Sequence, residues 1–282
     1  MEEISIALAI NDIMSKVFYS IEENIYALLD DIAFVSQKII NNEIFEKIFS
    51  KTEGILLVGN ALILGVILFY SVNYLFSHIF VSKLEPPNEF IFKLIIFTII
   101  MNSANWICLQ IINIVDIITQ SIQLIGKNIF FEEITFSNFI TNINEKIYTE
   151  NFEIDIISFD GIIKSFTSAG FMNLIFSYSL RYIMIQAFVL ISPFAFLSLI
   201  NNRTEWFFKT WIKMFLSLLI EQILVILILL LSFSFDYTNT TISKLMYIGI
   251  IYALMRVNNY MYMLFGGIST NINRNLTNIN KE

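Results

Sequence analysis

The stretch ISPFAFLSLINNRTEWFFKTWIKMF, residues 191–215, joins two apolar segments through a short polar turn. Pro193 lies near the end of the first segment, where its missing N–H bends or ends a helix. Arg203 lies in the turn, and Trp206 and Trp211 lead into the second segment. Membrane helices carry tryptophan at their interfaces and basic residues in short inner loops. The stretch therefore predicts a membrane hairpin, with these four residues as its bend and interface anchors.

The composition of the whole chain agrees with a membrane setting. Of its 282 residues, 56% are hydrophobic and only 15% are charged, and the mean hydropathy is +0.70. Soluble domains carry roughly 25% charged residues, so most of this surface must face something other than water, for which lipid is the simplest candidate. The net charge of −7 argues against stable nucleic-acid binding, which needs a basic surface to neutralise phosphates.

Five apolar segments are long enough to cross the hydrocarbon core of a bilayer. They are residues 54–82, 90–115, 169–199, 211–235 and 242–268. The first segment contains Gly54, Gly59 and Gly65, which favour close approach of a neighbouring helix. The predicted fold is an all-α integral membrane protein with about five transmembrane helices.

The segments around the spans divide the chain further. An amphipathic N-terminal helical region covers residues 1–53, and its mainly acidic polar face favours packing against protein over attachment to anionic lipid. The first two spans occupy 54–126, and charges return in a small insertion at 127–168. The last three spans occupy 169–270, and a polar tail covers 271–282.

Basic residues in the short loops predict the orientation. Lys83 lies in one short loop, and Arg203, Lys209 and Lys213 lie in or beside the other. By the positive-inside rule these loops and the C-terminus are inside, while the N-terminus and the insertion at 127–168 are outside the cytoplasm.

Three charged residues fall within predicted spans: Arg181, Glu221 and Arg256. Each costs roughly 2.5–3.5 kcal/mol near a helix centre, so such residues face a bundle interior or a cavity. Glu221 would then bridge one or both arginines. Three roles follow from this placement: a polar clamp that fixes helix packing, the lining of a hydrated path, or contact with a partner subunit.

Cysteine and histidine counts limit the chemistry. The chain has one cysteine, Cys108, and one histidine, His78. These counts exclude an intramolecular disulfide, a cysteine-rich metal site and every motif that needs two histidines. No nucleophile motif or pair of membrane carboxylates is evident. We therefore expect no catalytic residues, no cofactor, no metal and no enzymatic activity.

The span layout and residues 191–215 together resemble the TrbL-type polytopic inner-membrane subunits of type IV secretion and conjugation systems. In that family a helix end with proline, a short basic turn and an aromatic-rich helix start recur. The resemblance implies a structural or channel subunit of the bacterial cytoplasmic membrane. It implies contacts with other inner-membrane subunits and its own copies, and transient contact with translocated DNA or protein. The alternative is an autonomous small-solute permease or channel, which the charges within the spans favour.

Overall fold

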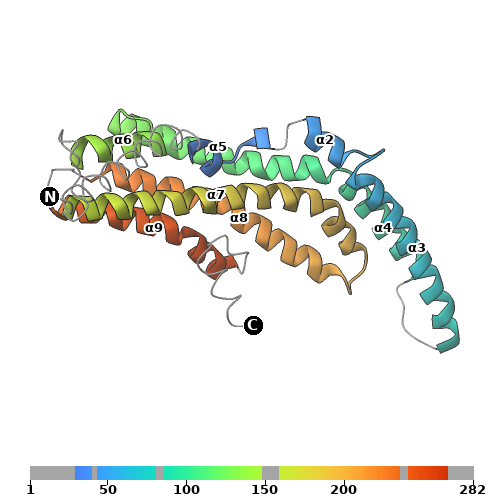
Figure 1. Cartoon of the computed structure of the whole chain (residues 1–282). Coiled ribbons are helices and arrows are strands. Elements are labelled where there is room, and N and C mark those ends of the chain that lie inside the picture. Colours follow the sequence, from blue (N-terminus) through green and yellow to red (C-terminus); the bar gives the residue numbers. More distant parts are fainter. Residues whose placement is uncertain (1–28, 40–42, 81–85, 148–158, 236–240, 266–282) are drawn as a thin grey trace, which may run out of the picture. The chain divides into compact units, whose positions relative to one another are not determined.

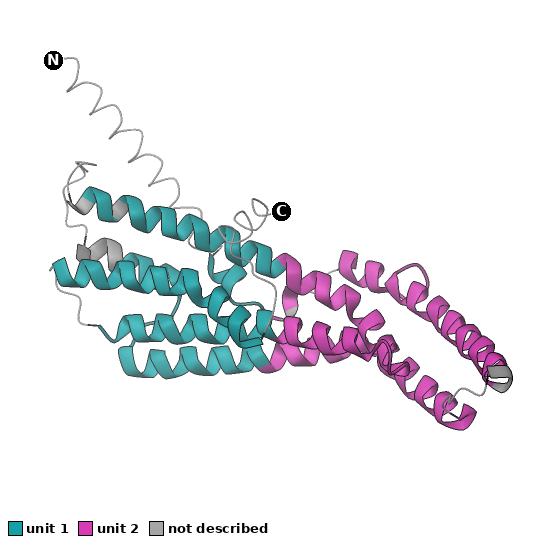
Figure 2. Cartoon of the chain, turned by 90° about the horizontal axis from the view of Figure 1, so that it is seen from below, with its two compact units in different colours: residues 1–35, 115–182, 217–282 teal, residues 36–114, 183–216 magenta. Residues whose placement is uncertain are grey.

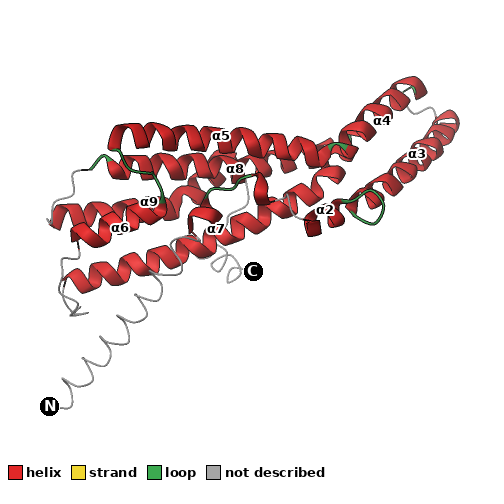
Figure 3. Cartoon of the chain, turned by 90° about the horizontal axis from the view of Figure 1, so that it is seen from above, coloured by secondary structure: helices red, strands yellow, loops and turns green. Residues whose placement is uncertain are grey.

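The computed structural model describes residues 29–39, 43–80, 86–147, 159–235 and 241–265. Within these ranges every regular element is a helix (Figure 3). The predicted all-helical class is confirmed. Most of the amphipathic N-terminal region and the whole tail at 271–282 lie outside the described residues.

The helices are labelled in chain order in Figure 1. Residues 29–33 are helical and precede the labelled elements. The others are η1 (Gln37–Ile39), α2 (Glu43–Phe49), α3 (Ile55–Phe80), α4 (Pro87–Asn102), α5 (Ala104–Phe130), α6 (Phe136–Ile147), α7 (Phe159–Leu197), η2 (Ser198–Ile200), α8 (Glu205–Phe233) and α9 (Thr241–Phe265).

The chain forms two compact units, which Figure 2 shows in different colours. Unit 1 holds residues 1–35, 115–182 and 217–282, and unit 2 holds residues 36–114 and 183–216. Helices α5, α7 and α8 each contribute one part to each unit.

Four helical stretches in the described residues are long and apolar enough to cross a membrane. They are Ile55–Ser77 in α3, Ala104–Phe130 in α5, Gly161–Ile200 across α7 and η2, and Glu205–Phe233 in α8. Helix α9 occupies the position of the fifth predicted span but is not among the four. Its Lys244, Arg256 and Asn258 reduce its apolar character.

The segment predicted as one span at 90–115 is divided between two helices. Helix α4 has 16 residues, or about 24 Å of helix, and α5 begins after Ser103. The Nδ2 of Asn102 donates to the carbonyl of Thr98, 2.9 Å away, and to Oδ1 of Asn60 on α3, 3.2 Å away. Polar side chains that bond to the backbone four residues back bend helices. The break between α4 and α5 lies at Asn102-Ser103.

Helix α7 is longer than predicted. It runs for 39 residues, from Phe159 instead of 169, and its length of about 58 Å is nearly twice the hydrocarbon thickness. The start of α7, all of α6 and the end of α5 therefore fall within the insertion predicted at 127–168. Residues 148–158 of that insertion lie outside the described part.

The core of unit 1 is apolar and rich in aromatic rings. Phe139 of α6 packs edge-on against Phe171 of α7, with 6.5 Å between ring centroids, and lies 5.9 Å from the ring of Tyr247 on α9. Leu29 and Ala33 are fully buried in the same core. Residues 29–35 of the N-terminal region therefore pack against the other helices of unit 1.

Two glycines allow helices to approach closely inside unit 1. A Cβ added to Gly126 of α5 would lie 2.7 Å from a methyl group of Leu230 on α8, and one added to Gly170 of α7 would lie 2.6 Å from Ile251 on α9. In α3, by contrast, Gly65 has nothing within 4 Å of an added Cβ. Of the glycines that the sequence pattern singled out, Gly59 does face a close neighbour, because a Cβ added there would lie 3.1 Å from the sulfur of Met101 on α4.

Asp30 holds the start of α6. Its carboxylate accepts hydrogen bonds from the N–H of Phe136 (2.6 Å), the N–H of Ser137 (3.1 Å) and the hydroxyl of Ser137 (2.8 Å). The first N–H groups of a helix have no partner within the helix, and a carboxylate there also complements the helix dipole. Burial raises the pKa of Asp30, and these three donors oppose that rise.

Asp30→Ala should lower the free energy of unfolding by about 1–2 kcal/mol, because it leaves the start of α6 without its acceptors. Thermal unfolding of the purified chain in detergent measures the loss. The matched control is Asp31→Ala, since Asp31 is the exposed carboxylate next in sequence. An equal loss of unfolding free energy in the two variants would contradict the role of Asp30 as the cap of α6.

Candidate functional site

Two charged side chains are buried together in unit 1. Arg181 on α7 is 0% exposed and Glu221 on α8 is 1% exposed, and the two interact electrostatically. With Tyr178, Gln222 and Asn258 they form a group that we name the buried polar cluster. An isolated charge at this depth would be expensive, and opposite charges offset part of that cost.

Arg181 donates from Nη2 to the carbonyl of Ala33. Ala33 ends the helical residues 29–33, and the last carbonyls of a helix have no partner within it. A cation at this end also complements the helix dipole. The guanidinium lies 5.2 Å from the ring centre of Tyr178, in the geometry of a cation–π contact. Arg181 thus caps the C-terminal end of the helical residues 29–33, which belong to the N-terminal segment, residues 29–35.

Gln222 holds the next part of the same segment. Its Oε1 accepts from the N–H of Val35 (3.1 Å), and its Nε2 donates to the hydroxyl of Thr119 on α5 (3.1 Å). Val35 is buried and lies beyond the end of the helical turn, so its N–H has no helical acceptor. An amide side chain satisfies a donor and an acceptor at one site.

Glu221 is paired on one of its two oxygens. Oε2 accepts from Nδ2 of Asn258 on α9, 3.2 Å away, while Oε1 is buried with no hydrogen-bond partner. Nε and Nη1 of Arg181 also have none. Among the described residues, Arg181 and Glu221 therefore interact electrostatically without a direct hydrogen bond.

Arg256 does not join this cluster, so the predicted group of three charges is corrected to a pair. Its side chain is exposed, and Nε donates to the hydroxyl of Tyr252, 3.0 Å away on the same helix. Asn258, two residues later, reaches Glu221 instead. Residues two apart on a helix point about 200° apart, so burial of Asn258 turns Arg256 outward.

The hairpin at 191–215 is present in unit 2 as the end of α7, η2 and the start of α8. Pro193 lies inside α7 and leaves the carbonyl of Val189 without its helical donor. The hydroxyl of Ser192 donates to that carbonyl, 2.6 Å away. Nε1 of Trp211, on α8, donates to the neighbouring carbonyl of Phe188, 2.9 Å away.

The other predicted anchors differ in placement. Trp211 is only 2% exposed and packs against Phe196, Phe208 and Phe215, so it is a core residue of unit 2 and not an interface anchor. Trp206 is 65% exposed. Arg203 is exposed in the turn. These positions fit interface roles for Trp206 and Arg203 alone.

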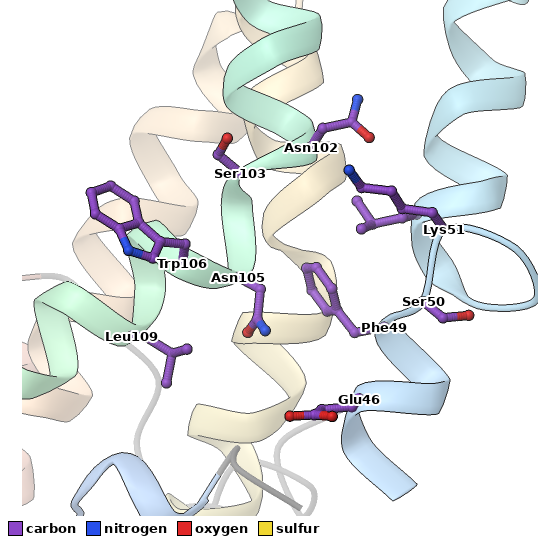
Figure 4. Close-up of a pocket in the computed structure, with 10 residues that line it drawn as sticks. Glu46, Phe49, Ser50, Lys51, Asn102, Ser103, Asn105, Trp106 and Leu109 are labelled. Carbon is purple, nitrogen blue, oxygen red and sulfur yellow. The ribbon is translucent and has the colours of Figure 1, made fainter. Parts of the chain in front are cut away.

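A pocket of about 340 Å³ lies in unit 2 at the break between α4 and α5. The ring of Phe49 lies among the pocket side chains, with Asn105 of α5 across from it (Figure 4). The polar lining residues are Glu46, Ser50, Lys51, Asn102, Ser103 and Asn105. Oδ1 of Asn105 is buried without a partner. The sequence signal for this pocket is the polar run from Asn102 to Asn105 inside an apolar segment.

Metal ligands and reactive groups are sparse in the described residues. No three side chains of His, Cys, Asp or Glu come close enough there to hold a metal ion. Cys108 is fully buried.

No protein-family model matches the chain, and no curated protein or solved structure matches it either.

Replacing Arg181 tests the cluster. Arg181→Met leaves Glu221 without a compensating charge and the carbonyl of Ala33 without a donor, so we expect a loss of about 3–5 kcal/mol in stability. Arg256→Met removes an exposed charge and should change stability by less than about 0.5 kcal/mol. Membrane accumulation and thermal unfolding in detergent measure both.

The double variant Arg181→Met with Glu221→Gln should recover part of the loss, because it removes the uncompensated carboxylate. An Arg256→Met loss as large as that of Arg181→Met would contradict the assignment of Asn258 as the partner of Glu221.

Proposed function

We propose that this chain is a non-enzymatic, membrane-embedded structural or channel subunit of a bacterial conjugative type IV secretion machine, which assists translocation of DNA or protein. The observation that carries the proposal is the exposed apolar surface of the α3–α4 hairpin. In the spanning stretch of α3 only 11% of the residues are buried. Helices α3 and α4 lie side by side (Figure 1).

Large apolar side chains are exposed along both helices of this hairpin. On α3 they include Leu57, Leu62, Leu64, Leu68, Phe69 and Leu75; on α4 they are Ile91, Phe92, Ile95, Ile96 and Ile99. Exposed patches of this extent mark a membrane or a protein contact. Lipid covers such a face in any membrane protein, and neighbouring subunits cover part of it in an assembly. The exposed apolar surface of the α3–α4 hairpin therefore supports a role in an assembly with other membrane subunits.

The buried polar cluster also favours a structural role. Arg181 donates to the backbone at Ala33, and Glu221 accepts from Asn258. These contacts hold the N-terminal segment and α9 against α7 and α8. A polar clamp that fixes packing is the role that the contacts support best.

The resemblance at residues 191–215 adds a local argument. The helix end with Pro193, the turn with Arg203 and the helix start with Trp206 form a hairpin, the arrangement expected for the TrbL-type family. We further propose five spans, with α9 as the fifth. Residues 127–168 and the N-terminus lie outside the cytoplasm, and the C-terminus lies inside.

The proposed partners follow from this setting. They are the lipid bilayer of the bacterial cytoplasmic membrane, other inner-membrane subunits of the machine and further copies of this chain. Translocated DNA or protein touches the chain only transiently, because a net charge of −7 offers no basic surface for stable binding of nucleic acid. The proposed role needs no cofactor.

Deletion of the chain from a conjugating host should abolish transfer to recipient cells, and complementation in trans should restore it. Counting recipients that acquire the transferred DNA measures the effect. Complementation with the Arg256→Met variant serves as the matched control, because that residue lies outside the cluster and is exposed. Unchanged transfer after a clean deletion would contradict the proposal.

A second candidate, an autonomous small-solute permease or channel, is favoured by one observation. The buried oxygen and nitrogen atoms without partners on Tyr178, Arg181 and Glu221 are polar groups that internal water would satisfy. The purified chain in liposomes would then show solute flux or a discrete conductance. We expect neither from the isolated chain, since the proposed function needs the other subunits.

A further inference from the structure

A groove of about 480 Å³ lies in unit 2 between α3 and the α7–α8 turn. We name it the Arg203 groove. Its walls are mainly apolar, and the lining residues are Leu62, Gly65, Val66, Phe69, Phe194, Leu197, Ser198, Ile200, Asn201, Arg203 and Thr204. This volume falls within the range of about 300–1,000 Å³ that is usual for small-molecule sites.

Polar groups gather at one end of the groove, in the turn. Oδ1 of Asn201 accepts from the backbone N–H of Arg203, 2.9 Å away, and the hydroxyl of Thr204 donates to the carbonyl of Ser198, 2.7 Å away. These bonds order the backbone of the turn. They leave the guanidinium of Arg203 without a protein acceptor among the described residues.

Arg203 is the only charged residue among the described lining residues. The nearby Lys209 is different, because its Nζ lies 2.9 Å from the carboxylate of Glu205 on the same helix. The groove thus combines an apolar wall with one unpaired cation at its end. A ligand with an apolar chain and an anionic head complements this arrangement in shape and in charge.

The position along the chain points to the source of that ligand. Arg203 and Thr204 lie between the spanning stretches that end at Ile200 and begin at Glu205. This is where the headgroup region of a bilayer meets a membrane protein, and phosphate groups are abundant at that depth. Leu62 and Phe69 of the apolar wall lie in the middle part of the spanning stretch Ile55–Ser77 of α3.

We propose that the Arg203 groove binds an anionic phospholipid, with one acyl chain along the apolar wall and the phosphate on the guanidinium of Arg203. Arginine suits this role because its planar fork donates two parallel hydrogen bonds to phosphate oxygens. The described lining holds no carboxylate to pair with the ammonium group of a zwitterionic headgroup. An anionic lipid should therefore bind more tightly than phosphatidylcholine.

Gly65 provides a direct way to close the groove. It lines the groove, and a Cβ added there would have no atom within 4 Å. A leucine at this position therefore fills space that the acyl chain would occupy, without a clash in the lipid-free protein. Gly249 on α9 also has open space around an added Cβ and lies in unit 1, so Gly249→Leu is the matched control.

The experiment uses the full chain purified in detergent. Phosphatidylglycerol or phosphatidylcholine with the same acyl chains is added, and native mass spectrometry counts the lipid that remains bound. We expect the wild type to retain phosphatidylglycerol about tenfold more strongly, because its phosphate carries a net charge that the choline of phosphatidylcholine neutralises. Arg203→Gln should remove this preference, and Arg203→Lys should keep part of it.

Gly65→Leu should reduce the binding of both lipids, while Gly249→Leu and Lys213→Gln should bind them as the wild type does. Lys213 is an exposed cation on α8 outside the groove lining. Unfolding temperatures without added lipid verify that each variant is folded. Equal retention of the two lipids by the wild type, or unchanged binding by folded Arg203→Gln or Gly65→Leu, would overturn the proposal.

Discussion

Buried backbone groups that no helix satisfies are the constraint on which this structure depends. In an apolar interior each unpaired N–H or C=O costs free energy, so a side chain must reach it. Arg181 reaches the carbonyl of Ala33, and Gln222 reaches the N–H of Val35. Polar residues inside the apolar helices α7 and α8 are thus explained by breaks in the backbone elsewhere. Polar side chains such as Arg181 and Gln222 therefore have a structural role, although in the sequence alone they could also line a path for a substrate.

This relation also explains how much could be predicted from the sequence. The helical class, the hairpin at 191–215 and the unusual placement of Arg181 and Glu221 are visible, because a charge within an apolar run is conspicuous. Their partners are not visible, since one partner is a backbone carbonyl and any residue has one. The direction of Arg256 depends on the rotation of α9, which the weak apolar stripe of that helix does not determine. The cap of Asp30 on α6 joins residues 106 positions apart, and no local pattern encodes it.

The two units use polar side chains differently. Unit 1 encloses its charges at Arg181 and Glu221 among helices with a well-filled aromatic core. Unit 2 instead carries the apolar α3–α4 hairpin, with polar groups at helix breaks, as at Asn102 and Asn201. Breaks in helices expose backbone and create concave surfaces. Both pockets described in unit 2 lie at such breaks. The candidate binding sites are therefore found where a helix ends and its backbone groups need partners.

The contacts of residues 29–39 have a consequence for biosynthesis. Val35 leaves the ribosome early, but its partner Gln222 is 187 residues later in the chain. At roughly 5–20 residues per second, about 10–40 s pass before that partner has been made. During this interval the buried side chains Leu29 and Ala33 lack the part of their core that α8 and α9 supply. Residues 29–35 are thus translated well before Gln222, so their full docking is a late step of membrane assembly.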